Sequence, residues 1–469
     1  MFSDQLDFLM GLTNTQASTL GRACLLNPSH ISRLRNGRRP LPKNPVFLND
    51  MAAYLAGRVQ ENYQRIALCQ AMGIAEWPDD KQQAASLVAA WLAAQEDAAP
   101  DLAPILASFA GIQPGCPNVA ADPAALPPAK SYYYGPEGKQ QAVLQFFDLI
   151  LKEKEPQTLL LYSDENFSWL GDDPIFSVQW AKGFTEVLMR GNRVKMIHAI
   201  GRNMNEMLQG VAHWIPIYAT GMIEPYYYPK LRDSISQRTL FIAPNTAAIV
   251  SSSFNLKTDG MLNELITDKE AVSAIVQEYN NYFELCSPLM HIMTRQKQEE
   301  LWTVYNTLLN TEGESVCMSD VPTFVTMPEW VAKSMQERAP QSRIYAQWQK
   351  ASSFLSELNE NTCYTELLPP FDRDASNIPL PRADLLNAPG LCYTDEEWRA
   401  HIENSLRFAE EHQWYRQIQH AGSPENIFLF GKDSRGFMVF KTNSPGVAFA
   451  ITEANMVNSF WSYLSRFLP

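Results

Sequence analysis

The sequence predicts a multidomain chain with an all-α bundle at its N-terminus, followed by an α/β body with an α+β C-terminal part. Residues 1–95 carry only patterns of helical period, whereas short apolar runs alternate with amphipathic helical patterns beyond residue 131. Between them, residues 97–130 are rich in alanine and proline and poor in charge, as semi-rigid linkers are. We therefore divide the chain into a helical head (1–95), a linker (96–130), an α/β domain (131–295) and an α+β domain (296–469).

Length and charge limit the classes of protein to consider. A chain of 469 residues has room for two to four domains, and 46% hydrophobic and 19% charged residues are ordinary values for globular proteins. Residues 1–60 hold seven basic and three acidic residues, a net charge of +4, which leaves −17 for the rest of a chain whose net charge is −13. A basic head on an acidic body fits a protein that contacts phosphate with one end only.

The cysteine pattern and the absence of targeting segments indicate a compartment. The seven cysteines are scattered and form no C-x-x-C motif, which favours reduced thiols in a cytosol over disulfides or a zinc site. The N-terminus lacks the basic region and apolar run of a signal peptide. No run of about 18 apolar residues is present that would span a membrane. We therefore expect a cytoplasmic protein without a membrane partner.

Residues 15–40 predict two short helices joined by a turn. Thr15 can cap a first helix that extends to about Leu26, and Leu20 and Cys24 lie four apart on its inner face. Asn27 precedes a proline and suits the N-cap of a second helix.

The second helix is short and has a basic continuation. Ile31 and Leu34 are three apart and should face inward, and Gly37 can end the helix in a left-handed conformation. Arg38, Arg39 and Lys43 follow. A different interpretation is a small helical cap whose arginines are merely solvated.

The run ISRLRNGRRP at residues 31–40 resembles the Cro/C1 (XRE-type) helix-turn-helix family, whose second helix commonly reads I-S-x-x-E-x-G-x-R-x-P. The resemblance covers residues 6–56. Arg35 replaces the usual glutamate of this family, and Leu25 occupies the turn position at which glycine is frequent. The turn must therefore take another backbone shape or strain a leucine.

The resemblance implies binding to double-stranded DNA. Cro/C1-like proteins place the second helix in the major groove, with its N-terminal residues against base edges. Base contacts are then expected from Ser29, His30 and Arg33, and phosphate contacts from Arg35, Arg38, Arg39 and Lys43. Because one head reads only a few base pairs, we expect a homodimer held through the body or through the helices of residues 58–95.

The body should contain a sheet flanked by helices. Buried strands are expected at 158–162, 193–199, 239–243 and 247–252, helices at about 140–152, 175–189, 203–218 and 269–283, and a largely parallel sheet. The C-terminal part should contain a helix at 394–413 that begins with a Thr394/Glu397 capping box, strands at 426–430, 436–441 and 447–451, and a closing helix at 456–467. No internal repeat of fixed period is visible.

A ligand site is expected at the carboxyl ends of the first two strands, where open α/β sheets bind ligands. This rule selects Asp164, Glu165, His198 and Arg202, and Arg202 could pair with an anionic group of a small-molecule or peptide effector. An aromatic wall is expected beside them, formed by Trp214, Tyr226, Tyr227 and Tyr228. The alternatives are that the tyrosines are half core and half surface, and that His198 is a hydrogen-bonded core residue.

Signatures of catalysis are missing from the sequence. There is no phosphate-binding G-x-x-x-x-G-K-[ST], no G-x-G-x-x-G, no G-x-S-x-G and no histidine pair at metal-binding helical spacing. In its order of strands and helices, the body faintly resembles phospholipase D-like effector domains of transcription regulators. Enzymes of that family need His-x-Lys, which this chain lacks, so the resemblance implies a non-catalytic relative.

Two functional classes remain open. The first is a one-component transcription regulator with a sensing or oligomerising body, without catalytic residues, metal ligands or a cofactor. The second is an enzyme or defence-type effector whose head tethers it to DNA.

Overall fold

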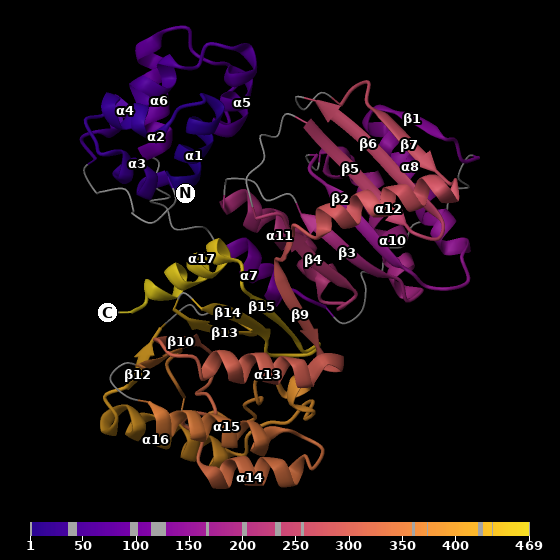
Figure 1. Cartoon of the computed structure of the whole chain (residues 1–469). Coiled ribbons are helices and arrows are strands. Elements are labelled where there is room, and N and C mark those ends of the chain that lie inside the picture. The colour runs from indigo at the N-terminus through magenta and orange to yellow at the C-terminus, as the bar shows by residue number, and fades with distance from the viewer. Residues whose placement is uncertain are drawn as a thin grey trace.

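The computed structural model describes residues 2–35, 45–93, 102–113, 128–165, 168–198, 204–229, 236–254, 258–358, 362–372, 374–420, 425–433 and 435–468. It confirms a multidomain chain with a helical N-terminal part and two mixed sheets covered by helices (Figure 1).

The head is a bundle of short helices. They are α1 (Phe2–Leu12), α2 (Ala17–Ala23), α3 (Pro28–Arg35), α4 (Leu48–Gly57), α5 (Asn62–Met72) and α6 (Lys81–Ala93). Leu9, Leu20, Ile31, Leu34 and Leu55 are fully buried and belong to one apolar cluster. The inward positions predicted for the two central helices are therefore confirmed.

The turn between α2 and α3 contains a strained leucine. Leu25 has φ of 53°, in the left-handed region, and its side chain is 94% exposed. The sequence left open whether the turn takes another backbone shape or strains this leucine, and the structure shows the strained leucine. The side chain of Asn27 accepts a hydrogen bond from the backbone N–H of Ser29 at 2.9 Å, as expected of an N-cap.

The prediction that Thr15 caps the first helix is wrong. The N-cap of α2 is Gln16, which makes no side-chain capping bond. The hydroxyl of Thr15 is buried and lies 2.8 Å from that of Thr13, so it is not free to cap.

A short buried helix lies within the Ala/Pro-rich stretch. This helix is α7 (Ala103–Ala110). It packs against α11 (Met204–Tyr218) and contacts β13 (Ile427–Lys432) and β14 (Gly436–Lys441) (Figure 1). Its side chains Ile105, Leu106 and Phe109 are buried in an apolar cluster that includes residues from both sheets. Residues 102–113 are therefore part of the core of the body, whereas the sequence assigned them to the linker.

The first sheet has eight strands. Its elements are β1 (Tyr132–Tyr134), α8 (Gly135–Lys152), β2 (Thr158–Ser163), α9 (Ser168–Gly171), α10 (Pro174–Met189), β3 (Arg193–His198), α11, β4 (Ile223–Tyr227), β5 (Ser236–Ala243), β6 (Ala247–Phe254), β7 (Leu262–Ile266), α12 (Lys269–Phe283) and β8 (Ser287–Pro288). The strand order is β1-β7-β6-β5-β2-β3-β4-β8.

The prediction of a largely parallel sheet is wrong. Only the β2–β3 and β3–β4 pairs are parallel among the described strands, and the other five pairs of this sheet are antiparallel. The reason is the connections. Helices α10 and α11 provide the crossovers that parallel strands need, whereas β5 and β6 are joined by a short turn at residues 244–246 that permits only antiparallel pairing.

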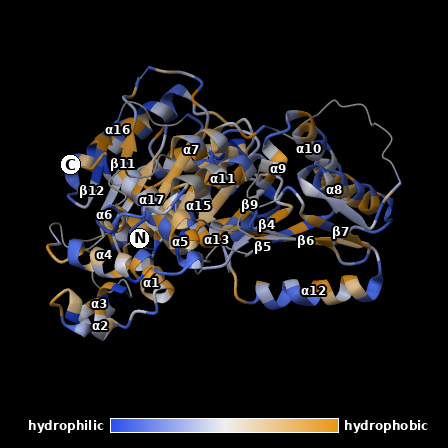
Figure 2. Ribbon diagram, turned by 90° about the horizontal axis from the view of Figure 1, so that it is seen from above, coloured by the Kyte–Doolittle hydropathy of each residue, from blue (hydrophilic) through white to orange (hydrophobic). Residues whose placement is uncertain are grey.

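The two faces of the first sheet are covered by different helices. Leu159 and Leu161 of β2 face the cluster with α8, α10 and α11, while Leu160 and Tyr162 face the cluster with α12. This follows from the alternation of side chains along a strand. Figure 2 shows α12 on one side of the sheet and α8, α9 and α10 on the other.

The second sheet has seven strands. Its elements are β9 (Met290–Thr294), η1 (Arg295–Lys297), α13 (Gln298–Leu309), β10 (Ser315–Met318), α14 (Glu329–Arg338), α15 (Ile344–Glu357), β11 (Tyr364–Leu368), η2 (Ala383–Leu386), α16 (Asp395–Glu411), β12 (Tyr415–Gln419), β13, β14, β15 (Val447–Ile451) and α17 (Ala454–Ser465). The chain passes from one sheet to the other at Leu289, between β8 and β9, a few residues before the boundary chosen from the sequence. The Thr394/Glu397 capping box is confirmed, as are the expected C-terminal strands and closing helix.

The two sheets repeat one topology. The order β9-β15-β14-β13-β10-β11-β12 reproduces β1-β7-β6-β5-β2-β3-β4, and all six strand pairs have the same direction in both. In each, a helix follows the first strand and another follows the last. The body is therefore an internal structural duplication that no sequence repeat revealed.

Candidate functional site

The outer face of α3 is open to solvent. Ser29 and Arg33 lie four positions apart and are exposed, while Ile31 and Leu34 on the opposite face are fully buried. His30 is half-buried, and its ring packs edge-on against Phe47 with centroids 5.9 Å apart. Of the three residues expected to contact bases, Ser29 and Arg33 therefore share a free face, and His30 lies at its edge.

The residues expected to contact phosphate are only partly described. Arg35 forms an ion pair with Asp7 of α1, with Nε 2.5 Å from the carboxylate oxygen and with side chains 40% and 58% exposed. Such an exposed pair stabilises a fold by at most about 1 kcal/mol, so a phosphate could replace the carboxylate. Arg38, Arg39 and Lys43 lie outside the described residues.

A cavity of about 50 Å³ lies in the first half of the body, between the sheet and α8, α9, α10 and α11. Aromatic side chains form most of its wall. They are Phe146, Phe147, Trp169, Trp180, Phe184, Trp214 and Phe241. Trp180 and Trp214 contact each other, with ring centroids 5.5 Å apart, and Trp169 contacts Phe241 at 6.2 Å. This set spans five separate elements, so the wall forms only when the domain folds.

Two polar side chains stand at one end of the cavity. Ser163 and His198 are the last residues of β2 and β3, and they are direct partners in the parallel register. His198 Nε2 is hydrogen-bonded to the hydroxyl of Tyr218, and Trp214 packs edge-on against the imidazole at 6.0 Å. Burial lowers the pKa of His198 to about 4, so the ring is neutral at pH 7.

The structure brings together some of the expected effector residues and separates others. His198, selected by the rule of strand ends, and Trp214, expected in the aromatic wall, both line the cavity. Tyr226 lies on the opposite face of the sheet, where it contacts Phe283 of α12 at 4.5 Å. Tyr228 contacts Tyr282 at 5.5 Å on the same side.

The prediction of a tyrosine wall beside His198 is therefore wrong for Tyr226 and Tyr228. The register places Ile197 beside Tyr226, so that tyrosine takes the face away from His198. Asp164 turns to the same α12 side, where it accepts hydrogen bonds from the hydroxyl of Tyr162 at 2.8 Å and the backbone N–H of Arg238 at 2.5 Å. Arg202 lies outside the described residues.

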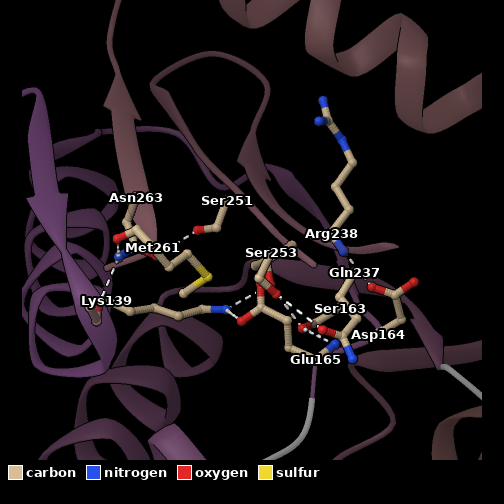
Figure 3. A network of polar contacts seen from close by, with 12 residues as sticks. Lys139, Ser163, Asp164, Glu165, Gln237, Arg238, Ser251, Ser253, Met261 and Asn263 are labelled. Carbon is tan, nitrogen blue, oxygen red and sulfur yellow. Dashed lines mark hydrogen bonds and ion pairs between the residues drawn. The ribbon is translucent and has the colours of Figure 1, made fainter. Parts of the chain in front are cut away.

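A buried polar network that the sequence analysis did not predict lies beside the cavity (Figure 3). The ammonium group of Lys139 on α8 lies 2.6 Å from the carboxylate of Glu165 and 2.7 Å from the hydroxyl of Thr239, and both charged side chains are almost wholly buried. Burial lowers the pKa of Lys139, and the adjacent Glu165 opposes this shift. The Thr239 hydroxyl also lies 2.9 Å from that of Ser163, which joins the network to the polar end of the cavity.

The network continues across β5, β6 and β7. The hydroxyl of Ser251 donates to Asn263 at 2.7 Å, and that of Ser253 donates to Gln237 at 3.1 Å (Figure 3). Two features of the sequence point to this network: Glu165, which the rule of strand ends selected, and the alternation of Ser251 and Ser253, which indicates a polar strand face. The lysine gave no such signal, because it precedes the amphipathic pattern assigned to residues 140–152.

No group of three or more His, Cys, Asp or Glu side chains in the part of the chain that the structure describes could hold a metal ion. Likewise, no helix within the described ranges is long and apolar enough to cross a membrane.

Comparisons with known proteins give weak likenesses only. No protein-family model matches the chain, and no curated protein matches it. Among solved structures, TrmBL2, an archaeal chromatin protein whose structure shows a novel mode of DNA binding, is 17% identical with a TM-score of 0.24, over 34% of this chain and 53% of that one. Polyphosphate kinase from Porphyromonas gingivalis is 8% identical with a TM-score of 0.23, over 75% of this chain and 54% of that one. Likenesses of this size carry no argument about function.

Proposed function

We propose that this chain is a sequence-specific, DNA-binding transcriptional regulator of the one-component type, whose head binds double-stranded DNA and whose body senses an effector or oligomerises. The observation that carries the proposal is the open face of α3. Ser29 and Arg33 are exposed on a helix that Ile31 and Leu34 fix in the bundle, so the helix face that carries them has a fixed orientation. The resemblance to the Cro/C1 helix-turn-helix gives this face its role.

The charge distribution supports binding through the head alone. With +4 in residues 1–60 and −17 in the rest of the chain, nucleic acid should be attracted to one end and repelled by the other. We propose that Arg35, Arg38, Arg39 and Lys43 contact phosphates, with Arg35 exchanging Asp7 for a phosphate oxygen.

The test compares substitutions on the head. DNA sites are first selected from a random pool by the full chain, and binding is then measured by fluorescence anisotropy on a selected site and on random DNA. Arg33→Ala should weaken selected-site binding by about 1–3 kcal/mol and relax specificity. Arg39→Ala should weaken both DNAs alike and reduce the salt slope by about one unit.

A matched control is available on α5. Arg65 is an exposed arginine of the same bundle but lies outside α2 and α3, so Arg65→Ala should retain normal affinity and specificity. If Arg33→Ala and Arg65→Ala behaved alike on both DNAs, the assignment of α3 to the major groove would be refuted.

We further propose a homodimer that presents two heads to a palindrome. Half-sites about 34–36 Å apart, or a multiple of this spacing, then match two second helices in successive major grooves. Analytical ultracentrifugation of the full chain at micromolar concentration should give the dimer mass. A monomer that binds a single half-site tightly would contradict the proposal.

The body is proposed to act without catalysis and without a cofactor. The sequence lacks the phosphate-binding and nucleophile motifs of the common enzyme classes, which supports a regulatory role. Screens of the purified chain with phosphodiester, ester and peptide substrates should show no turnover. Turnover that survives purification and depends on a residue of the body would favour the alternative, an enzyme tethered to DNA.

A further inference from the structure

The cavity of the first half occupies the position where an α/β sheet is best able to bind a ligand. It lies at the carboxyl ends of β2 and β3, and β2 is the strand at which the sheet changes direction, with parallel β3 on one side and antiparallel β5 on the other. In open α/β sheets, ligands bind outside the carboxyl ends of the parallel strands.

The size of the cavity limits its occupant. A volume of about 50 Å³ exceeds the roughly 10–15 Å³ that one water needs, and it is smaller than the roughly 150 Å³ of an engineered cavity that binds benzene. A molecule smaller than benzene therefore fits the cavity as it stands, and a molecule of one ring fits only if the wall shifts outward. Larger ligands would need the helices to separate.

The wall of the cavity favours an apolar ligand over water. Water molecules inside would meet mainly the rings of Trp169, Trp180 and Trp214, which offer few hydrogen-bond partners. Poorly bonded water is readily displaced by an apolar group, and this exchange strengthens binding.

The polar end of the cavity supplies hydrogen bonds without net charge. Ser163 contributes a hydroxyl, and the imidazole of His198 is neutral at pH 7. The nearest charges, Lys139 and Glu165, neutralise each other in a pair at 2.6 Å. A carboxylate or an ammonium group would lose its hydration at this end and gain no opposite charge from the described residues, which disfavours charged ligands.

We propose that this cavity binds a small uncharged apolar molecule, at most one ring in size, that carries a single hydroxyl or carbonyl group directed to Ser163 and His198. Its use as the effector site rests on the proposed regulatory function, whereas binding itself does not. The proposal differs from the anionic ligand expected from the sequence, because that expectation depended on Arg202, which lies outside the described residues, whereas Ser163 and His198 offer hydrogen bonds without charge.

The binding test uses the full chain and three one-ring probes. Phenol, toluene and benzoate are titrated separately, and binding is measured by ligand-observed NMR. Phenol should saturate a single site, toluene should bind several-fold more weakly, and benzoate should bind about tenfold more weakly or not at all. Benzoate binding as tight as phenol binding would overturn the proposal.

Substitutions locate the site. Leu161→Phe and Leu170→Phe each add a ring to a side chain that lines the cavity, one from β2 and one from α9, and each should abolish phenol binding. Met189→Phe is the control, since Met189 is 68% exposed on α10 and makes no part of the wall. Two filling variants are used because Leu161 is buried and its enlargement could unfold the domain.

Ser163→Ala tests the polar end. This variant should weaken the binding of phenol several-fold and leave the binding of toluene unchanged, because only phenol has a hydroxyl group that loses a hydrogen-bond partner. If both filling variants fold and bind phenol normally, the cavity is not the site. Failure of phenol binding would leave the DNA result for Arg33→Ala unaffected, so the two proposals can fail separately.

Discussion

Replacing Leu25 by glycine should stabilise the head. The backbone of Leu25 is left-handed, with φ of 53°, which costs an ordinary residue roughly 1–2 kcal/mol. The side chain is 94% exposed, so its removal sacrifices almost no packing. Glycine has no strain here but loses roughly 0.5–1 kcal/mol more backbone entropy on folding, so the net gain is about 0.5–1 kcal/mol. For a domain of about 90 residues this corresponds to a rise in Tm of about 2–8 °C.

Differential scanning calorimetry of the full chain measures this change, and hydrogen exchange of the α2 and α3 amides assigns the transition to the head. Leu25→Ala is the matched control. Alanine removes the same exposed side chain but keeps the strain, so its Tm should stay close to that of the unmodified chain. A Tm that falls with glycine, or rises equally with alanine, would refute the argument from backbone strain.

Three further predictions concern the body, and urea denaturation of the full chain checks each. Lys139→Met should cost about 3–5 kcal/mol because it leaves the Glu165 carboxylate buried without its cation, and adding Glu165→Gln should recover part of the loss. Phe109→Ala should cost about 3–5 kcal/mol because Phe109 is 1% exposed, whereas an exposed alanine substitution such as Val178→Ala should cost far less. Burial lowers the pKa of His401 from 6.5 to about 4. Between these pH values the unfolded chain binds a proton at this histidine and the folded chain does not, so the stability should fall as the pH drops from about 6.5 to 4. His401→Gln should flatten this fall, and an unchanged pH slope would show that His401 is not responsible.

The sequence was informative about the head because the signals there are local. Asn27 and the following proline mark the start of α3, and the spacing of Ile31 and Leu34 identifies its buried face. The position of Leu25 in the turn predicted either another backbone shape or a strained leucine, and the leucine is strained. Thr15 failed as a cap because its hydroxyl bonds to that of Thr13, two residues earlier, and the helix begins one residue later than expected, with Gln16 as its N-cap.

The candidate site in the body was predicted only in part, because it depends on pairing between distant strands. The rule of strand ends found His198, and helix periodicity brought Trp214 to the same side. Whether Tyr226 lies beside His198 or behind it depends on the register between β3 and β4, and a shift of one residue would reverse the answer. Lys139 was missed because its charge is matched by Glu165 from another element, and no local pattern reports that pairing.

The position of α7 has a consequence for the order in which the chain can fold during synthesis. The ring of Phe109 packs 4.6 Å from that of Phe449, a residue 340 positions later. Contacts of such long sequence separation form late, because a long loop must first be closed. While translation proceeds, α11 can cover one side of α7, but the side that meets β13, β14 and β15 must wait for the C-terminus. Chains that stop before residue 427 should therefore leave Leu106 and Phe109 uncovered, as an apolar surface for chaperones to bind.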